Sequence, residues 1–74
     1  MQQQEIQLFK TDLCCEKQIE KLSVYLQQVD AIIGWNVDLE DVDAVLRVET
    51  LPLPAKTIID KVKEAGFYCE ELPD

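Results

Sequence analysis

The fold is decided within residues 19–37, which read IEKLSVYLQQVDAIIGWNV. In the first part of this stretch, apolar residues recur at steps of three and four, the period of an amphipathic helix: Ile19, Leu22, Leu26 and Val29. Residues 32–38 follow a period of two, which places Trp35 and Val37 on one face of a strand. The change of period therefore predicts a helix that leads directly into a strand.

The same reading extends in both directions along the chain. The segment LPLP at residues 51–54 interrupts regular structure, because proline disfavours helical geometry in the residue before it. Pro54 can still occupy the first turn of a helix, and Gly66 is a typical residue for ending one. The predicted elements are a strand over 6–11, a helix from 16 to about 30, strands over 32–38 and 45–49, a helix from 54 to about 66, and a strand over 67–72.

The resulting order, β-α-β-β-α-β, predicts an α+β fold of the ferredoxin-like type. Two right-handed crossovers joined by a hairpin give a four-stranded antiparallel sheet of order 4-1-3-2, with both helices on one face. On the open face we expect an apolar contact patch formed by Ile6 and Leu8, joined by Ile33 and Val45. The predicted core consists of Phe9, Leu13, Ile19, Leu22, Leu26, Trp35, Val37, Leu46, Val48, Ile58, Val62 and Phe67.

Length and composition exclude several classes of function. The 74 residues predict a single domain over 1–74, with a core of about 5–72. Lys and Arg total 7 against 15 Asp and Glu, and the net charge of −8 argues against nucleic-acid and anionic-membrane partners. No apolar run reaches the roughly 20 residues of a membrane span, and the opening MQQQE does not resemble a signal peptide. Without histidine, nucleophile–base pairs or phosphate loops, no enzyme is expected.

The chain contains three cysteines, namely Cys14, Cys15 and Cys69. Two are adjacent, so they do not form the even, spread set of a disulfide framework, and we expect reduced thiols and a cytoplasmic protein. Cys15 falls at a loop–helix junction, whereas Cys69 falls inside a predicted strand and is expected to pack in the core. Cys15 should therefore be the more exposed and more reactive thiol.

Three short segments carry a resemblance to a known family: FKTDL at residues 9–13, WNVDL at 35–39 and AGF at 65–67. At these spacings the sequence resembles the heavy-metal-associated domain, the ferredoxin-like module of copper chaperones and of metal-pump amino termini. The resemblance covers roughly residues 6–72. It implies a metal site in the first loop, where the family carries Cys-x-x-Cys and holds Cu(I), Zn(II) or a similar soft ion between two thiolates.

The chain departs from the family pattern at this site. The resemblance places the first cysteine of the motif at Cys15 and the second at Gln18, so that half of the motif is lost. Cys14 is an additional thiol directly before Cys15. Because soft ions prefer thiolates to amides, Gln18 marks a lost ligand position, and Cys15 with Cys14 is the remaining candidate ligand set.

Three functions are compatible with these residues. The first is a weakened Cu(I)-type binding or trafficking module that needs a second protomer or a partner protein to complete its ligands. The second is a metal-free protein-interaction module that kept the scaffold and lost the site. The third is a redox sensor with a strained disulfide between Cys14 and Cys15. The acidic residues 38–43 lack the spacing and the glycine of a calcium loop and predict a solvated turn.

Overall fold

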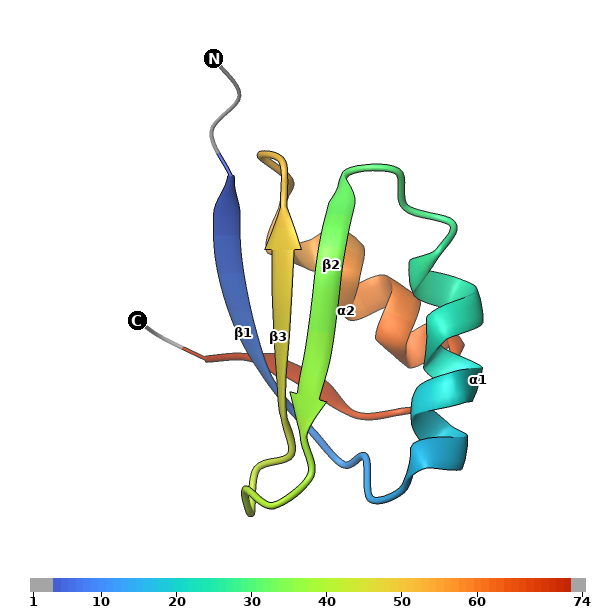
Figure 1. The fold of residues 1–74 in the computed structure, drawn as a ribbon. Helices are drawn as coiled ribbons and strands as arrows, with labels where there is room; N and C mark the ends of the chain where they lie inside the picture. Colours follow the sequence, from blue (N-terminus) through green and yellow to red (C-terminus); the bar gives the residue numbers. More distant parts are fainter. Residues whose placement is uncertain (1–3, 73–74) are drawn as a thin grey trace.

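The computed structural model describes residues 4–72 and consists of a four-stranded antiparallel sheet with two helices on one face (Figure 1). The strand order is β2-β3-β1-β4, which confirms the predicted ferredoxin-like fold and its sheet order. Residues 1–3 and 73–74 of the expected domain lie outside the described residues. The elements are β1 (Glu5–Thr11), α1 (Glu16–Leu26), β2 (Ile32–Asp38), β3 (Val45–Thr50), α2 (Ala55–Glu64) and β4 (Cys69–Glu71).

The register of the sheet places one apolar row under the helices. Phe9 of β1 and Val37 of β2 both pair with Leu46 of β3, and Trp35 pairs with Val48 one step further along. Alternation along each strand puts these side chains on the helical face. Phe9, Leu46 and Val48 are completely buried, so this row forms the floor of the core.

Helix α1 begins where expected, at Glu16, but ends at Leu26 and not near residue 30. After Leu26 the chain continues with two backbone hydrogen bonds that each join residues three apart, one fewer than in an α-helix. The N–H of Gln28 donates to the carbonyl of Tyr25, and the N–H of Val29 donates to that of Leu26. These three-residue steps form turns that keep Val29 close to its helical position without continuing the α-helix.

Pro54 has an extended backbone, so it lies immediately before α2 and not within the first turn of the helix. At the other end, Gly66 has a φ of +96°, a left-handed conformation that residues with a side chain rarely adopt. The N–H of Gly66 donates to Lys63 and that of Phe67 to Val62, so the free carbonyls at the helix end are satisfied. Gly66 therefore ends the helix as predicted.

The core differs from the predicted set in a few members. Ile19, Trp35, Val37 and Phe67 are only partly buried, while the small residues Ala44 and Ala65 are buried. Cys69 is buried, as expected from its place in the last strand. β4 is also shorter than predicted and begins at Cys69. The buried apolar residues are Phe9, Leu13, Leu22, Leu26, Ala44, Leu46, Val48, Ile58, Val62, Ala65 and Cys69.

The open face of the sheet is less apolar than predicted. Ile6 and Leu8 do face away from the helices, and Ile6 is exposed. The sheet register, however, sets Glu49 beside Ile6 and Arg47 beside Leu8. Because charged residues alternate with the apolar ones, this face does not form a continuous apolar patch.

Neither helix within residues 4–72 has the length and apolar character needed to cross a bilayer.

Candidate functional site

The loop between β1 and α1 holds both candidate ligands. Cys14 and Cys15 are free thiols and both are exposed. Cys15 is the residue that immediately precedes α1, and its extended backbone makes no side-chain capping bond. Its carbonyl accepts hydrogen bonds from the N–H groups of Gln18 and Ile19, which close the first turn. The two thiols therefore lie at the amino-terminal end of α1, where the helix dipole favours negative charge.

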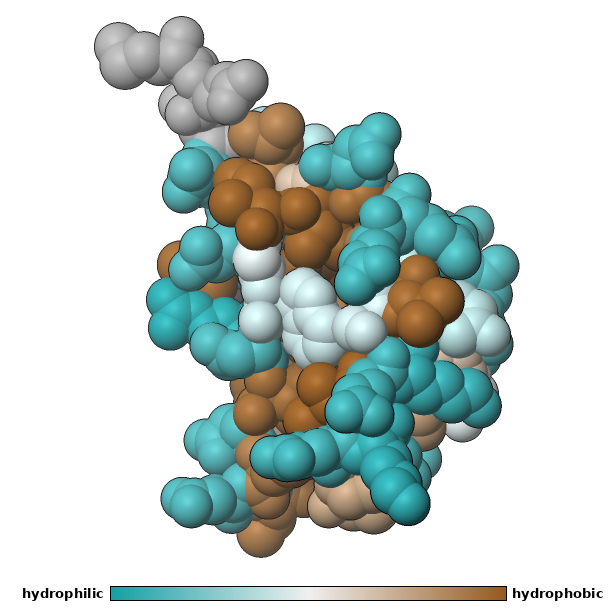
Figure 2. Space-filling view, turned by 45° about the vertical axis from the view of Figure 1, so that its right-hand side comes forward, coloured by the Kyte–Doolittle hydropathy of each residue, from teal (hydrophilic) through white to brown (hydrophobic). Residues whose placement is uncertain are grey.

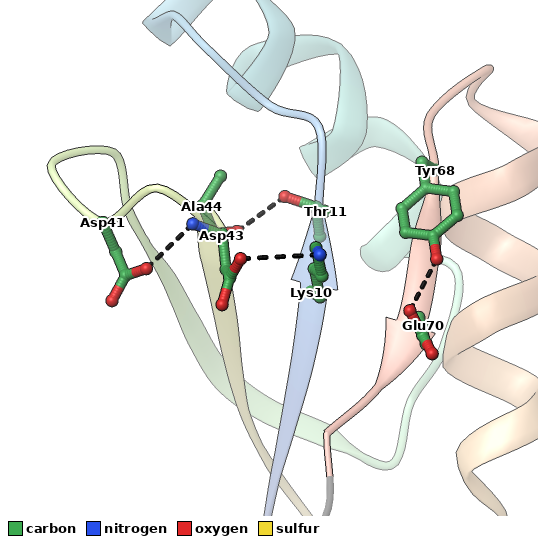
Figure 3. Close-up of polar contacts among 7 residues, drawn as sticks. All are labelled: Lys10, Thr11, Asp41, Asp43, Ala44, Tyr68 and Glu70. Atoms are coloured by element: carbon green, nitrogen blue, oxygen red, sulfur yellow. Dashed lines mark hydrogen bonds and ion pairs between the residues drawn. The ribbon is translucent and has the colours of Figure 1, made fainter.

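Thr11, the last residue of β1, anchors the start of this loop. Its buried hydroxyl donates a hydrogen bond of 2.6 Å to the carbonyl of Ala44, as Figure 3 shows, and accepts one of 3.3 Å from the N–H of Leu13. Its own N–H donates to the carbonyl of Asp43. Leu13, the residue directly before the two cysteines, is buried in the core and is therefore held in place.

The loop is also tied to the segment that enters β4. The side-chain Oδ1 of Asp12 accepts a hydrogen bond of 2.9 Å from the backbone N–H of Tyr68. The phenol of Tyr68 donates a bond of 2.6 Å to Glu70 (Figure 3), and this bond raises the pKa of the Tyr68 phenol above its ordinary value. The contacts of Asp12 and Thr11 thus hold the residues before Cys14 from two sides.

Gln18 has a role that the sequence analysis did not predict. Its side-chain Oε1 accepts a hydrogen bond of 2.8 Å from the backbone N–H of Cys14. Gln18 is the third residue of α1, the position from which a Gln or Glu side chain can reach back over the helix start. That position relative to Cys15 was the signal available in the sequence. At the position where the family resemblance implies a second cysteine, the structure has a residue that holds the loop closed on the helix.

The third cysteine does not join the exposed pair. Cys69 is buried with 4% of its surface exposed, and it pairs in register with Thr11. Burial raises the pKa of the Cys69 thiol to about 12, against a smaller lowering by the positive charge of Lys63. The predicted difference in exposure between Cys15 and Cys69 is therefore confirmed.

The donor set available to a metal ion is small. Within residues 4–72, no group of three or more His, Cys, Asp or Glu side chains is arranged to hold an ion. The exposed thiols of Cys14 and Cys15 supply two soft donors of the kind that Cu(I) prefers. The amide of Gln18 supplies only a harder oxygen, which already accepts a hydrogen bond. Within the described residues, the loop thus offers two exposed thiols and no third candidate ligand.

The acidic turn between β2 and β3 is held by hydrogen bonds from its backbone N–H groups to its own carboxylates. Asp38 accepts a hydrogen bond from the N–H of Glu40, and Asp41 accepts one from the N–H of Asp43. Asp43 also lies 3.6 Å from the ammonium of Lys10, as Figure 3 shows. These contacts shape a tight, exposed turn, in agreement with the prediction of a solvated turn.

Comparisons with known proteins are informative at the level of the fold. No protein-family model and no curated protein matches the sequence. Among solved structures, the apo domain of a copper chaperone for superoxide dismutase matches with a TM-score of 0.79 and 19% identity, covering 99% of this chain and 71% of that chain. The Cu(I)-loaded first domain of the human copper chaperone matches with a TM-score of 0.76 and 19% identity, covering 93% of each chain.

A third match is the yeast copper transporter domain Ccc2a, with a TM-score of 0.78 and 18% identity, covering 93% of this chain and 96% of that chain. The chain therefore has the fold of heavy-metal-associated domains, and the resemblance noted in the sequence is confirmed at that level. These structures are copper-chaperone and copper-transporter domains.

Proposed function

We propose that this protein is a soft-metal binding or trafficking module whose site is weakened, with a Cu(I)-type ion as its cargo. The observation that carries the proposal is the pair of exposed thiols, Cys14 and Cys15, at the entrance to α1. The fold shared with copper-chaperone and copper-transporter domains supports it, because the β1–α1 loop is where the sequence resemblance implies a metal site.

The proposed site is weak because Cys15 has an extended backbone, and adjacent side chains in an extended segment point apart, so we expect Cys14 and Cys15 to converge poorly on one ion. Cys15 is the principal ligand and Cys14 the auxiliary one, since Cys69 is buried away from them. Gln18 does not ligate in this proposal, because its side-chain oxygen is engaged by the N–H of Cys14. Tight binding then requires thiolates from a second protomer or from a partner protein. We place this exchange in the cytoplasm, where thiols stay reduced.

A metal-free interaction module is the second candidate, and one observation favours it. The hydrogen bond from Cys14 to Gln18, together with those of Thr11 and Asp12, holds the loop in place by protein contacts alone. A loop fixed in this way does not need an ion to be ordered. Under this alternative, the cysteines are exposed surface residues and the scaffold serves protein contacts, without nucleic acid or membrane as partner.

A Cu(I) competition titration under reducing conditions separates the two candidates. The protein competes with a coloured Cu(I) chelator, and the variants Cys15→Ser and Cys14→Ser are titrated beside the unmodified chain. Cys69→Ala is the matched control, because it removes a thiol that is buried. We expect Cys15→Ser to lose most of the competition and Cys69→Ala to keep it. Equal, negligible competition by all four proteins would support the metal-free module.

A further inference from the structure

β2 is an open edge of the sheet. It pairs only with β3, so the backbone groups on its other side have no strand partner within residues 4–72. Edge strands are commonly blunted by charges, prolines or bulges. Residues 31–37 contain neither a charge nor a proline, and the one protective feature is the irregularity between Ile32 and Gly34. This edge therefore has the properties of a surface that accepts another strand.

A groove lies beside this edge, between the end of α1 and the start of β2, and its lining combines polar groups with apolar side chains. Its volume is about 540 Å³, and its apolar lining comes from Leu26, Val29, Ile32, Ile33 and Trp35. Ile33 is 49% exposed, so it contributes an aliphatic side chain to the surface beside this edge. Figure 2 shows apolar and neutral surface between the sheet and α1, bordered by hydrophilic residues. We call this surface the β2 edge groove. It places backbone groups that have no strand partner beside apolar side chains.

The charges around the β2 edge groove are negative. Asp30 is the one charged residue in its lining, and Asp38 ends the strand at the other side. The last turn of α1 carries no basic residue, so the negative end of its dipole is not compensated there. Lys61, which reaches this region through Gln28, also pairs with Glu64. A partner with positive charge at both ends of an apolar segment would complement this arrangement.

We propose that the β2 edge groove binds an extended segment of a partner protein, apolar in its middle and basic at both ends, which adds to the sheet as a fifth strand. Main-chain hydrogen bonds to β2 would supply affinity, and apolar side chains in the groove together with the flanking charges would supply specificity. A second copy of this chain fits less well. Antiparallel pairing of two β2 strands about Gly34 sets Asp30 of one copy toward Asp38 of the other, and each copy carries a charge of −8.

This surface is separate from the metal proposal. The cysteine loop lies at the amino-terminal end of α1, and the groove lies at its carboxyl-terminal end. Figure 1 shows α1 running between the loop that follows β1 and the loop that enters β2. Eleven helical residues separate the two ends by roughly 16 Å. A peptide can therefore occupy the groove whether or not the thiols bind an ion, and a failure of either proposal leaves the other testable.

The test is a titration with two synthetic peptides, followed by tryptophan emission. The probe is the acetylated amide KKVTVTVTKK, and its control EEVTVTVTEE has the same apolar centre with acidic ends. Trp35 lines the groove and is the only tryptophan, so its emission reports this site. Gly34→Lys places a positive charge on the edge strand, which disfavours pairing with a basic segment. The fold has room for this side chain, because a Cβ at Gly34 meets nothing within 4 Å. Ile6→Lys is the matched control at an exposed position on β1, with β3 between it and β2.

We expect the basic peptide to shift the Trp35 emission and the acidic peptide to bind at least about tenfold more weakly. Gly34→Lys should weaken the basic peptide by about tenfold or more, while Ile6→Lys should leave its affinity within about twofold. Ile33→Lys serves as a second blocking variant if Gly34→Lys fails to fold by circular dichroism. Equal binding of both peptides, binding that survives both blocking variants, or no binding below about 1 mM would overturn the proposal. So would a concentration-dependent dimer that Gly34→Lys abolishes, because the edge would then belong to a second copy.

Discussion

The side-chain oxygen of Gln18 lies 2.8 Å from the backbone nitrogen of Cys14 and accepts its hydrogen bond. This contact joins the third residue of α1 to the loop that carries the two exposed thiols. A glutamine side chain at this position could have extended into solvent without a partner in the protein. Gln18 instead closes the first turn of α1 onto the loop, so the loop conformation is supported by the protein itself.

We expect Gln18→Ala to loosen this loop. Removing the acceptor leaves the N–H of Cys14 to water, and because the bond is exposed the cost should be about 0.5–1.5 kcal/mol in the free energy of unfolding. Urea unfolding monitored by Trp35 emission measures it. Gln18→Glu is the matched control, since it keeps an acceptor oxygen at the helix start and should retain stability. Equal loss in both variants would show that this bond does not hold the loop.

The three thiols should differ in their rates of alkylation. Cys14 and Cys15 are exposed, whereas Cys69 is buried with its pKa raised to about 12, so at pH 8 Cys69 should react only as the protein opens. Mass spectrometry of the peptides after timed labelling gives the rates. Labelling of Cys69 in the folded protein as fast as that of Cys15 would contradict the buried position of β4.

The raised pKa of Cys69 also predicts how stability depends on pH. Below the ordinary thiol pKa of 9.0 the group is protonated in both the folded and the unfolded chain and has no effect. Between pH 9 and about 12 the unfolded chain loses this proton and the folded chain keeps it, so stability falls as pH rises. Cys69→Ala should have a shallower decline over this window in urea unfolding series. Parallel declines for the two proteins would contradict the prediction.

Truncation of the core should be much more costly than truncation of the surface of the same helix. Leu22 is completely buried and Val24 is 58% exposed, although both lie on α1. Leu22→Ala should lower the free energy of unfolding by about 2–5 kcal/mol through lost burial and a residual cavity. Val24→Ala should change it by less than about 0.5 kcal/mol. Denaturant unfolding of both variants measures the difference, and similar losses would argue against the helix orientation described.

Thr11→Val is expected to destabilise the protein although it preserves the shape of the side chain. The hydroxyl donates to the carbonyl of Ala44 and accepts from the N–H of Leu13, and both groups are left without this partner in the variant. The expected cost is about 1–3 kcal/mol. Thr57→Val on α2 is a useful comparison at a partly buried position. Hydrogen exchange at Leu13 should also become faster, and unchanged exchange would show that Thr11 does not anchor the loop.

The order of the elements and of the strands was predictable because it follows from periodicity. The apolar steps from Ile19 to Leu26 mark a helix, and the alternation around Trp35 marks a strand. Because connections between strands through a helix are right-handed, few topologies remain for this order of elements. The end of α1 was not predictable in this way. Val29 keeps a helical phase through three-residue hydrogen bonds, so its apolar side chain continues the pattern after the α-helix has ended.

The degree of burial depends on neighbours that the sequence pattern does not contain. Trp35 lies on the edge strand β2 and has a strand partner on one side only, so it is half-buried and not enclosed. Ala44 is buried in a left-handed conformation with a φ of +42°, a feature of the turn and not of any periodicity. At the candidate site, the exposure of Cys15 was predictable from its place before a helix. The hydrogen bond of Gln18 was not predicted, because the Cys-x-x-Cys pattern carries no information on the contacts of a different residue at that position.

The most direct test of the metal proposal is the Cu(I) competition titration of the unmodified chain against Gln18→Cys under reducing conditions, with the ion-to-chain ratio read at the end point. A cysteine at residue 18 lies one helical turn from Cys15, the spacing at which two thiolates converge on one soft ion. We expect the unmodified chain to bind weakly, with one ion shared by two chains, and Gln18→Cys to bind at least about a hundredfold more tightly as one ion per chain. Tight binding of one ion per unmodified chain, or no gain in Gln18→Cys, would contradict the proposal that this is a metal site weakened by the loss of one thiolate.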